Sequence, residues 1–290
     1  MATEFEMNMK RYQSAVEAYL DTCFTQDLPQ KQLFEAMRYS LLAGGKRIRP
    51  MLVLEFCRIC GGDWEKAMPF AAAIEMVHTY SLIHDDLPCM DNDDYRRGCL
   101  TNHKVFGEAQ AVLAGDGLLT AAFDTASSAD ADPKVIVKIV NILASAAGEK
   151  GMVGGQVLDI DGERKKLSEE QVHTIHRLKT GALISAACRM GVAAANGSET
   201  QMAAAKAYAE AIGLAFQIRD DMLDVLGDAK KLGKATGMDV NKNTFVSLYG
   251  IERCKELIAM ENQKAMDALK VFEDRFFLEE LTELLASREF

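Results

Sequence analysis

The sequence contains little proline, few aromatic residues and no excess of basic charge. All five prolines lie in the first half of the 290 residues, and none follows Pro133. Because proline breaks helices more strongly than any other residue, residues 134–290 are able to form long helices. Only 7% of the residues are aromatic although 49% are hydrophobic, which predicts a core of Ala, Leu, Ile and Met, as in helix-on-helix packing.

The charge and the cysteines exclude several classes of protein. A net charge of −10 argues against a surface that binds nucleic acid or an anionic membrane, since both need a field of Lys and Arg. Seven cysteines without regular spacing do not form a disulfide framework. Cys57 and Cys60 make a lone Cys-x-x-Cys without the second pair that a zinc site needs, so we expect ordinary buried thiols in a reducing cytosol.

Long apolar runs and linkers are missing too. No uninterrupted apolar stretch reaches the length that crosses a bilayer, and residues 1–20 carry Glu and Lys in place of an apolar signal segment. We therefore expect a cytoplasmic protein without membrane insertion. Because no Ser/Pro/Gly-rich segment or charge block divides the chain, residues 1–290 are predicted to form a single all-α domain.

Apolar residues recur at spacings of three and four along most of the chain, and no strand pattern of convincing length is present. Gly44-Gly45 ends one such pattern, while Pro50 and Pro69 begin the next two. Helices are therefore predicted within residues 12–19, 33–42, 51–59, 69–84, 112–123, 133–143, 169–190, 202–226 and 251–272, with a short one from residue 278.

Two acidic clusters follow directly on apolar helical runs, at residues 85–91 (DDLPCMD) and 220–224 (DDMLD). Carboxylates at the mouth of an apolar cavity need a cation, and Mg²⁺ with a phosphorylated ligand is the best candidate. In the second cluster, a helical repeat of 3.6 residues puts Gln217 and the three aspartates on one stripe. In the first, a straight helix would turn Asp91 away from Asp85, but Pro88 disrupts the helix and a bulge can bring Asp91 back.

Either cluster alone could be a solvated helix face, which is the commoner meaning of an acidic triplet. Both clusters, however, adjoin core-like sequence, where uncompensated charge is expensive. Cations also lie near the first cluster in the sequence, in residues 44–50 (GGKRIRP) and in Arg96-Arg97, and His78 lies two helical turns before Asp85. Two basic turns beside a metal site imply an anion that carries several charges.

In this combination the sequence resembles the trans (E)-prenyl diphosphate synthases, and within them bacterial-type farnesyl diphosphate synthase. The resemblance runs from about Leu33 to Tyr249 and depends on five motifs in the family's order. It implies an all-α isoprenoid synthase fold, with antiparallel helices around a deep central cavity that has an acidic wall on each side, and a homodimer. The motifs are residues 44–50, 78–91, 96–98 (RRG), 179–181 (KTG) and 217–224.

The resemblance also implies a reaction, the condensation of isopentenyl diphosphate with dimethylallyl or geranyl diphosphate to give (E,E)-farnesyl diphosphate. Ionising the allylic carbon–oxygen bond requires strong neutralisation of the departing diphosphate, which metal ions and cationic side chains supply. The implied cofactor is Mg²⁺, about three ions per site, bridged by the allylic diphosphate. The implied metal ligands are Asp85, Asp86, Asp91, Asp220, Asp221 and Asp224.

The other site residues are carried over from the same motifs. Those implied to bind isopentenyl diphosphate are Lys46, Arg49, His78 and Arg97. Those implied to bind the allylic diphosphate are Arg96, Lys179, Thr180, Gln217 and Lys234, and the residues implied to take part in catalysis are Lys179, Thr180, Gln217, Asp85 and Asp220. Tyr80 and Ser81 occupy the positions that set chain length in the family.

The sequence departs from the family pattern at two places. The loop that carries Lys242 is about two residues short, which puts contact between Lys242 and the diphosphate in doubt. Cys99 stands where a basic residue is expected after Arg96-Arg97-Gly98.

Other functions are weighed against this one. The same chemistry could end at geranyl or geranylgeranyl diphosphate. A terpene cyclase would need no second diphosphate site, so residues 46–49 argue against it. A metal-dependent phosphohydrolase would need more histidines at ligand spacing, and a non-catalytic synthase subunit would be expected to have lost one acidic cluster.

Overall fold

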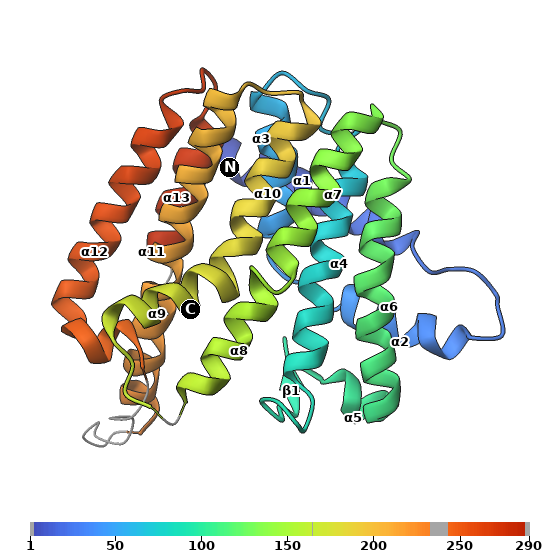
Figure 1. The fold of residues 1–290 in the computed structure, drawn as a ribbon, viewed down its shortest axis with the longest axis horizontal. Coiled ribbons are helices and arrows are strands. Elements are labelled where there is room, and N and C mark those ends of the chain that lie inside the picture. Colours follow the sequence, from blue (N-terminus) through green and yellow to red (C-terminus); the bar gives the residue numbers. More distant parts are fainter. Residues whose placement is uncertain (1–2, 164, 233–242, 288–290) are drawn as a thin grey trace. The chain divides into compact units, whose positions relative to one another are not determined.

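The structure is a computed structural model that describes residues 3–163, 165–232 and 243–287. It confirms the predicted all-α class, because helices make up nearly all of the regular structure in these residues (Figure 1). Only one short hairpin is added, of β1 (Tyr95–Arg96) and β2 (Cys99–Leu100). The helices are α1 (Glu4–Asp21), α2 (Lys31–Leu41), α3 (Ile48–Ile59), α4 (Met68–Asp85), α5 (Asn102–Phe106), α6 (Glu108–Ser127), α7 (Pro133–Ala147), α8 (Met152–Gly162), α9 (Glu169–His176), the π-helical turn η1 (Arg177–Gly181), α10 (Ala182–Ala194), α11 (Glu199–Leu232), α12 (Phe245–Leu269) and α13 (Phe276–Ser287).

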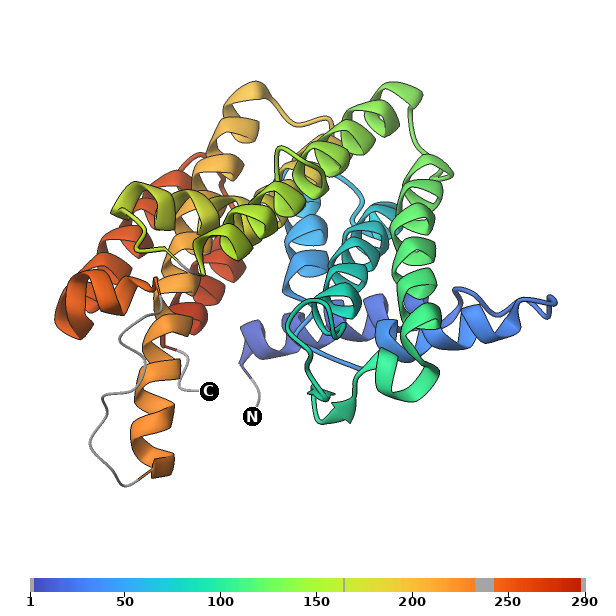
Figure 2. The same cartoon turned by 60° about the horizontal axis from the view of Figure 1, so that its bottom comes forward.

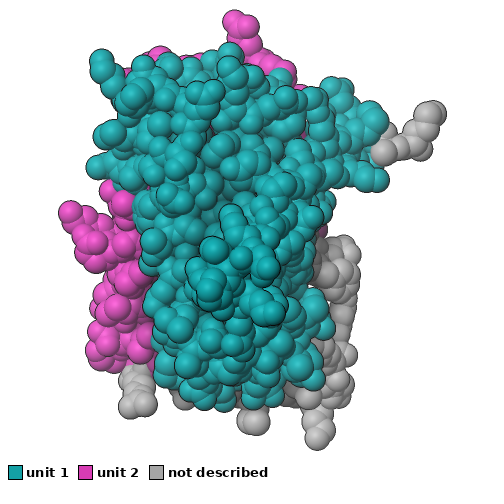
Figure 3. All heavy atoms as spheres, turned by 90° about the vertical axis from the view of Figure 1, so that its right-hand side faces the viewer, with its two compact units in different colours: residues 1–141, 193–196 teal, residues 142–192, 197–290 magenta. Residues whose placement is uncertain are grey.

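The contacts between Cα atoms divide the chain into two compact units, coloured separately in Figure 3. Unit 1 contains residues 1–141 and 193–196, and unit 2 contains residues 142–192 and 197–290. Each unit has its own set of packed helices, and the candidate site residues are divided between the two.

In unit 1, α4 is the central helix. Pro69 lies in its first turn, where the missing N–H costs nothing. Apolar residues cover the helix on every side, which is typical of a helix that is surrounded by others. It packs on α3 and on α6, which runs beside it in both views (Figures 1 and 2). This packing holds the C-terminal end of α4, where the first acidic cluster begins, in a fixed place.

In unit 2, the long helices α11 and α12 pack along each other (Figures 1 and 2). Ile218 and Met222 of α11 and Phe245 of α12 belong to one buried cluster, in which Phe245 is fully enclosed. The second acidic cluster lies on the same stretch of α11. Within the described residues, no helix has both the length and the apolar content needed to cross a membrane.

The structure differs from the predicted helices mainly around α8 and α10. No helix was predicted over α8, because its glycines weaken helix propensity. At Gly155, an added Cβ atom would lie 2.3 Å from the backbone nitrogen of Lys179, so the glycine lets α8 approach η1 closely. The single helix predicted for residues 169–190 is in fact α9, η1 and α10 in succession. The turn η1 widens the helix where Lys179 and Thr180 lie, and such π-turns are frequent at functional sites.

Candidate active site

The first acidic cluster begins where α4 ends. Asp86 is the C-cap of the helix, and the chain then reverses, so that the Asp91 N–H donates to the Asp85 carbonyl oxygen at 2.9 Å. The prediction that Asp91 returns beside Asp85 is confirmed for the backbone. The helix, however, ends at Asp85 and does not continue through a bulge at Pro88. Asp85 is half-buried and Asp91 is exposed, so both carboxylates are accessible from one turn.

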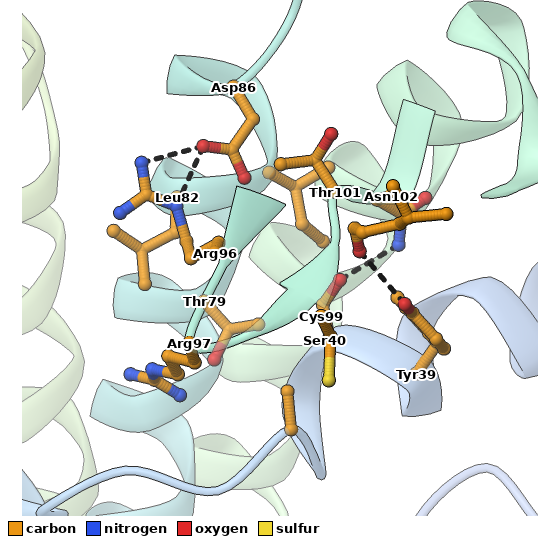
Figure 4. A pocket seen from close by; sticks show the side chains of 13 residues that line it. Tyr39, Ser40, Thr79, Leu82, Asp86, Arg96, Arg97, Cys99, Thr101 and Asn102 are labelled. Carbon is orange, nitrogen blue, oxygen red and sulfur yellow. Dashed lines mark hydrogen bonds and ion pairs between the residues drawn. The ribbon is translucent and has the colours of Figure 1, made fainter. Parts of the chain in front are cut away.

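Asp86 points toward Arg96 (Figure 4). Its Oδ1 atom accepts from Arg96 Nε at 2.7 Å and lies 2.6 Å from a second guanidinium nitrogen. Only 3% of Asp86 is exposed, and burial raises the pKa of its carboxyl despite the opposing effect of Arg96. Asp86 and Arg96 therefore form an ion pair here, although the motifs imply separate roles for them, in metal binding and in diphosphate binding.

Arg97 lies at the tip of the hairpin, in the turn between β1 and β2. It has a φ of +53° and Gly98 has a φ of +79°, the left-handed pair that a two-residue hairpin turn requires. Its guanidinium donates to the Gly44 carbonyl and packs under Gly45. A Cβ atom on Gly45 would lie 2.8 Å from Arg97 Cζ, and the φ of Gly45 is +126°, so only glycine suits this position.

His78 is surrounded by positive charge. Burial, followed by the charges of Arg49, Arg97, Arg47 and Arg96, holds the pKa of its imidazole well below the usual range. Burial and the charge of Arg97 also lower the pKa of Arg49, although Glu75 opposes this shift. These cations repel one another, as their lowered pKa values show. A bound anion would relieve that repulsion, so the group is suited to bind one.

Not every cation of the predicted basic loop belongs to that site. Arg47 is buried and forms an ion pair of 2.6 Å with Glu75 of α4, while its other terminal nitrogen donates to the Leu41 carbonyl. These contacts join the start of α3 to α4, which makes Arg47 a structural residue. Arg49 lies in the first turn of α3 and is half-buried, and Lys46 is exposed.

The two residues predicted to set chain length are consecutive in α4, so their side chains project about 100° apart around the helix. Tyr80 is buried, with its ring edge-on to His84 at 5.7 Å, and burial and then Asp85 raise its pKa to about 12. Ser81 is half-buried and donates to the His78 carbonyl at 2.8 Å. His84 lies 3.1 Å from the Val112 carbonyl of α6, so it joins two helices and does not point at the acidic turn.

Unit 2 contains a cavity of about 520 Å³, and a second set of polar residues forms part of its lining. Asp159 of α8, His176 of α9, Asp221 of α11 and Thr244 before α12 all line it. α9 begins with a capping box between Ser168 and Gln171, which fixes the start of the helix that carries His176.

An ion pair with a residue of α8 holds the side chain of Lys179, which lies on η1. Its Nζ atom lies 2.6 Å from Asp159 Oδ2, and both side chains are partly exposed. Sequence reasoning assigned no role to Asp159, because the helix that carries it was not predicted. The signal available was the pair Gly154-Gly155 inside an apolar run, since such glycines mark close packing. Thr180, the next residue on η1, is half-buried.

The predicted residues of α11 lie on one helix, as their spacing requires. Gln217 Oε1 lies 2.9 Å from His176 Nδ1, and Asp221 Oδ2 accepts from the Phe245 N–H at 2.7 Å. Asp220 is half-buried. The side chain of Asp224, and the whole of Lys234 and Lys242, lie outside the described residues.

The donor set of both acidic clusters consists of carboxylates, which are hard oxygen ligands and suit Mg²⁺ better than zinc or iron. Among the side chains that the structure describes, no three from His, Cys, Asp and Glu are grouped closely enough to hold a metal ion by themselves. In proteins Mg²⁺ takes one or two carboxylates and completes its octahedron with phosphate oxygens and water. The ligand roles stay predictions.

Comparison with known proteins decides the family. Residues 30–275 match the sequence model of the family described as Polyprenyl synthetase. The chain belongs to the polyprenyl synthetase family. The resemblance found from the motifs is thereby confirmed.

Proteins with different named products are similar to this chain. A farnesyl diphosphate synthase of Micrococcus luteus is 48% identical over 246 residues, which cover 84% of each protein. A chloroplastic geranylgeranyl pyrophosphate synthase of Capsicum annuum is 44% identical over 281 residues, covering 94% of this chain and 76% of that protein. The crystal structure of an FPP/GFPP synthase from Zymomonas mobilis superimposes with a TM-score of 0.90 at 36% identity, covering 99% of this chain and all of that one.

Proposed function

We propose that this polyprenyl synthetase is a Mg²⁺-dependent farnesyl diphosphate synthase. It condenses isopentenyl diphosphate with dimethylallyl diphosphate and then with the resulting geranyl diphosphate. The observation that carries the proposal is the group of arginines around His78, in the same unit as an acidic turn that suits a metal. A terpene cyclase has no use for a second diphosphate site, so this group favours a synthase.

The cationic group binds isopentenyl diphosphate, through Arg49, Arg97, His78 and Lys46. The diphosphate of this substrate must stay attached while its double bond attacks. Binding by protein cations serves that need, because it adds no metal to promote ionisation. Arg47, held by Glu75, keeps the start of α3 in place for Arg49.

The resemblance assigns the allylic diphosphate to the carboxylates and to the cations of η1 and of the hairpin. When bound, Mg²⁺ neutralises the charge that develops on the departing diphosphate. Lys179, oriented by Asp159, and Arg96, oriented by Asp86, neutralise the same charge from the protein side. As the resemblance implies, the metal would be held by Asp85, Asp91, Asp220, Asp221 and Asp224, and also by Asp86 if it exchanged Arg96 for the metal or its waters.

The oxygens of Thr180 and Gln217 face the allylic carbon as it becomes positive, so they stabilise the cation without attacking it. The isopentenyl double bond then forms the new carbon–carbon bond. The released diphosphate takes the final proton, because it is the strongest base close to that carbon. Excluding water protects the cation until this happens. That residues 1–290 form a single domain stays a prediction from the sequence.

The test is incubation with isopentenyl and dimethylallyl diphosphates, with and without Mg²⁺, followed by chromatography and mass spectrometry of the dephosphorylated products. We expect farnesol as the main product, and only when Mg²⁺ is present. Geranylgeraniol as the main product would support the proposed condensation reaction but would contradict the farnesyl product. A complete lack of prenyl product would overturn the proposal.

The position of His78 predicts proton uptake when isopentenyl diphosphate binds. Because burial and the arginines lower the pKa of His78, the imidazole is neutral in the free protein near pH 6.5. A bound diphosphate offsets the arginines, raises that pKa and so draws in a proton. Calorimetric titration in buffers of different ionisation enthalpy measures the uptake. We expect His78→Asn to bind with fewer protons taken up than the wild type; equal proton counts would contradict the assignment.

A homodimer is part of the proposal because α8 exposes an apolar stripe. Val153, Val157 and Ile160 follow the helical spacing of four and three, and all three are exposed. Such a contiguous apolar face marks an interaction surface, and a second copy of the chain suits it because like faces pair about a twofold axis.

Val157→Asp is expected to convert the dimer into a monomer of 31.9 kDa, since it would bury two charges at the centre of the interface. Size-exclusion chromatography with light scattering measures the mass. Met260→Asp is the matched control, because Met260 of α12 is 48% exposed, close to the 53% of Val157. A monomeric wild type, or a dimeric Val157→Asp, would exclude this face as the interface.

A further inference from the structure

His176, the last residue of α9, lies between two other elements of unit 2. Its Nδ1 atom is 2.9 Å from Gln217 Oε1 on α11. Because a carboxamide oxygen only accepts, Nδ1 carries the hydrogen and donates it. The imidazole also stacks on the ring of Phe245 at the start of α12, with ring centroids 4.8 Å apart and planes inclined by 28°.

The ring on which His176 stacks is held rigidly. Phe245 is fully buried, and its backbone N–H donates to Asp221 Oδ2 at 2.7 Å. Thr244, just before it, closes a capping box with Ser247. The imidazole therefore rests on a fixed ring on one side and is hydrogen-bonded to Gln217 of α11, so it can orient the Gln217 carboxamide.

His176 is also part of the wall of the polar cavity. It lines the 520 Å³ cavity together with Asp159 and Asp221. Burial lowers the pKa of the imidazole, with smaller opposing effects of Gln217 and Asp159. A neutral imidazole adds no positive charge beside a carbon that is itself becoming positive, so the group can act there by orientation alone.

We propose that His176 is a positioning residue, which fixes the Gln217 carboxamide so that the second lone pair of its oxygen faces the ionising allylic carbon. This inference rests on the proposed prenyl transfer. One lone pair of Oε1 accepts from Nδ1, and the other stays available at a set angle. A dipole oriented toward developing charge stabilises the transition state far more than it strengthens substrate binding.

His176→Phe tests the role, because phenylalanine keeps a ring against Phe245 and removes the Nδ1 donor. We expect kcat to fall about tenfold while KM for the allylic diphosphate changes by less than about twofold, the signature of an interaction made in the transition state. His176→Asn puts an amide N–H close to the place of Nδ1, and its kcat is expected to lie within about threefold of the wild type.

His173→Phe is the matched control. His173 lies one helical turn earlier on α9, and its ring meets the same Phe245 ring edge-on at 4.9 Å. Its Nε2 atom lies 3.3 Å from the Tyr249 hydroxyl, on α12 and not on α11. Both His→Phe variants should therefore lower the melting temperature similarly, whereas only His176→Phe should lower kcat.

The partner is identified by repeating His176→Phe in a Gln217→Ala background. If His176 acts through Gln217, its replacement costs little further activity once Gln217 is absent. An equal loss of kcat in both backgrounds, or in His173→Phe and His176→Phe, would overturn the positioning role. An active wild type with an unaffected His176→Phe would also overturn it, while a wild type that forms no prenyl product would overturn the proposed function itself.

Discussion

Asp85→Ala is expected to lower kcat by at least about 10²-fold, the scale on which removal of one preorganised electrostatic group acts. Asp85 is the last residue of α4, most of which is buried, and the Asp91 backbone N–H fixes the Asp85 carbonyl. The backbone of Asp85 is therefore held in one place. Loss of the Asp85 carboxylate is expected to weaken Mg²⁺ binding, and with less metal bound the departing diphosphate is less neutralised just as its bond breaks.

The dependence on Mg²⁺ separates this effect from misfolding. We expect Asp85→Ala to need a higher Mg²⁺ concentration for half-maximal activity, whereas an unfolded protein would lose activity at every concentration. Asp220→Ala in unit 2 should show a loss of the same order, because the same resemblance makes it a ligand. Steady-state kinetics over a range of Mg²⁺ concentrations measures both quantities.

Asp94→Ala is the matched control. Asp94 is an exposed aspartate three residues after Asp91, and it forms a surface ion pair of 2.7 Å with Lys104. Exposed pairs contribute little, so this variant should keep kcat within about twofold. Near-normal turnover of Asp85→Ala at low Mg²⁺ would refute the metal assignment.

The sequence predicted the fold class and the positions of the acidic clusters because both depend on local patterns. The apolar spacing of α4 and the proline in its first turn are readable without tertiary information. The same holds for the stripe of Gln217 and its neighbouring aspartates on α11.

What the sequence did not predict depends on contacts between distant segments. The pairing of Asp86 with Arg96 needs the hairpin to fold back on α4, and strands of two residues are too short for an alternating pattern to be visible. Asp159 and His176 were missed for related reasons. The first lies on a glycine-containing helix whose stability comes from packing on η1, and the second has a partner 41 residues away.

Tyr80→Ala is expected to shift the main product from farnesyl to geranylgeranyl diphosphate. Tyr80 is buried in α4, five residues before Asp85, at the position that the family uses to stop chain growth. The substitution removes a phenol that is larger than one five-carbon isoprene unit. The space that Tyr80 leaves is expected to admit one further isoprene unit before the growing prenyl chain reaches the end of its cavity.

Tyr80→Phe is the control, because it keeps the ring and removes only the hydroxyl, so its main product should stay farnesyl. Truncating a buried aromatic residue costs about 3–5 kcal/mol of stability, and the assay must therefore run well below the melting temperature of Tyr80→Ala. Chromatography of the dephosphorylated products from both variants measures the ratio of geranylgeraniol to farnesol. If Tyr80→Ala is folded, turns over and still ends at farnesol, another residue limits the chain. Ser81, which bonds back to the His78 carbonyl from the next position of α4, is then the residue to replace.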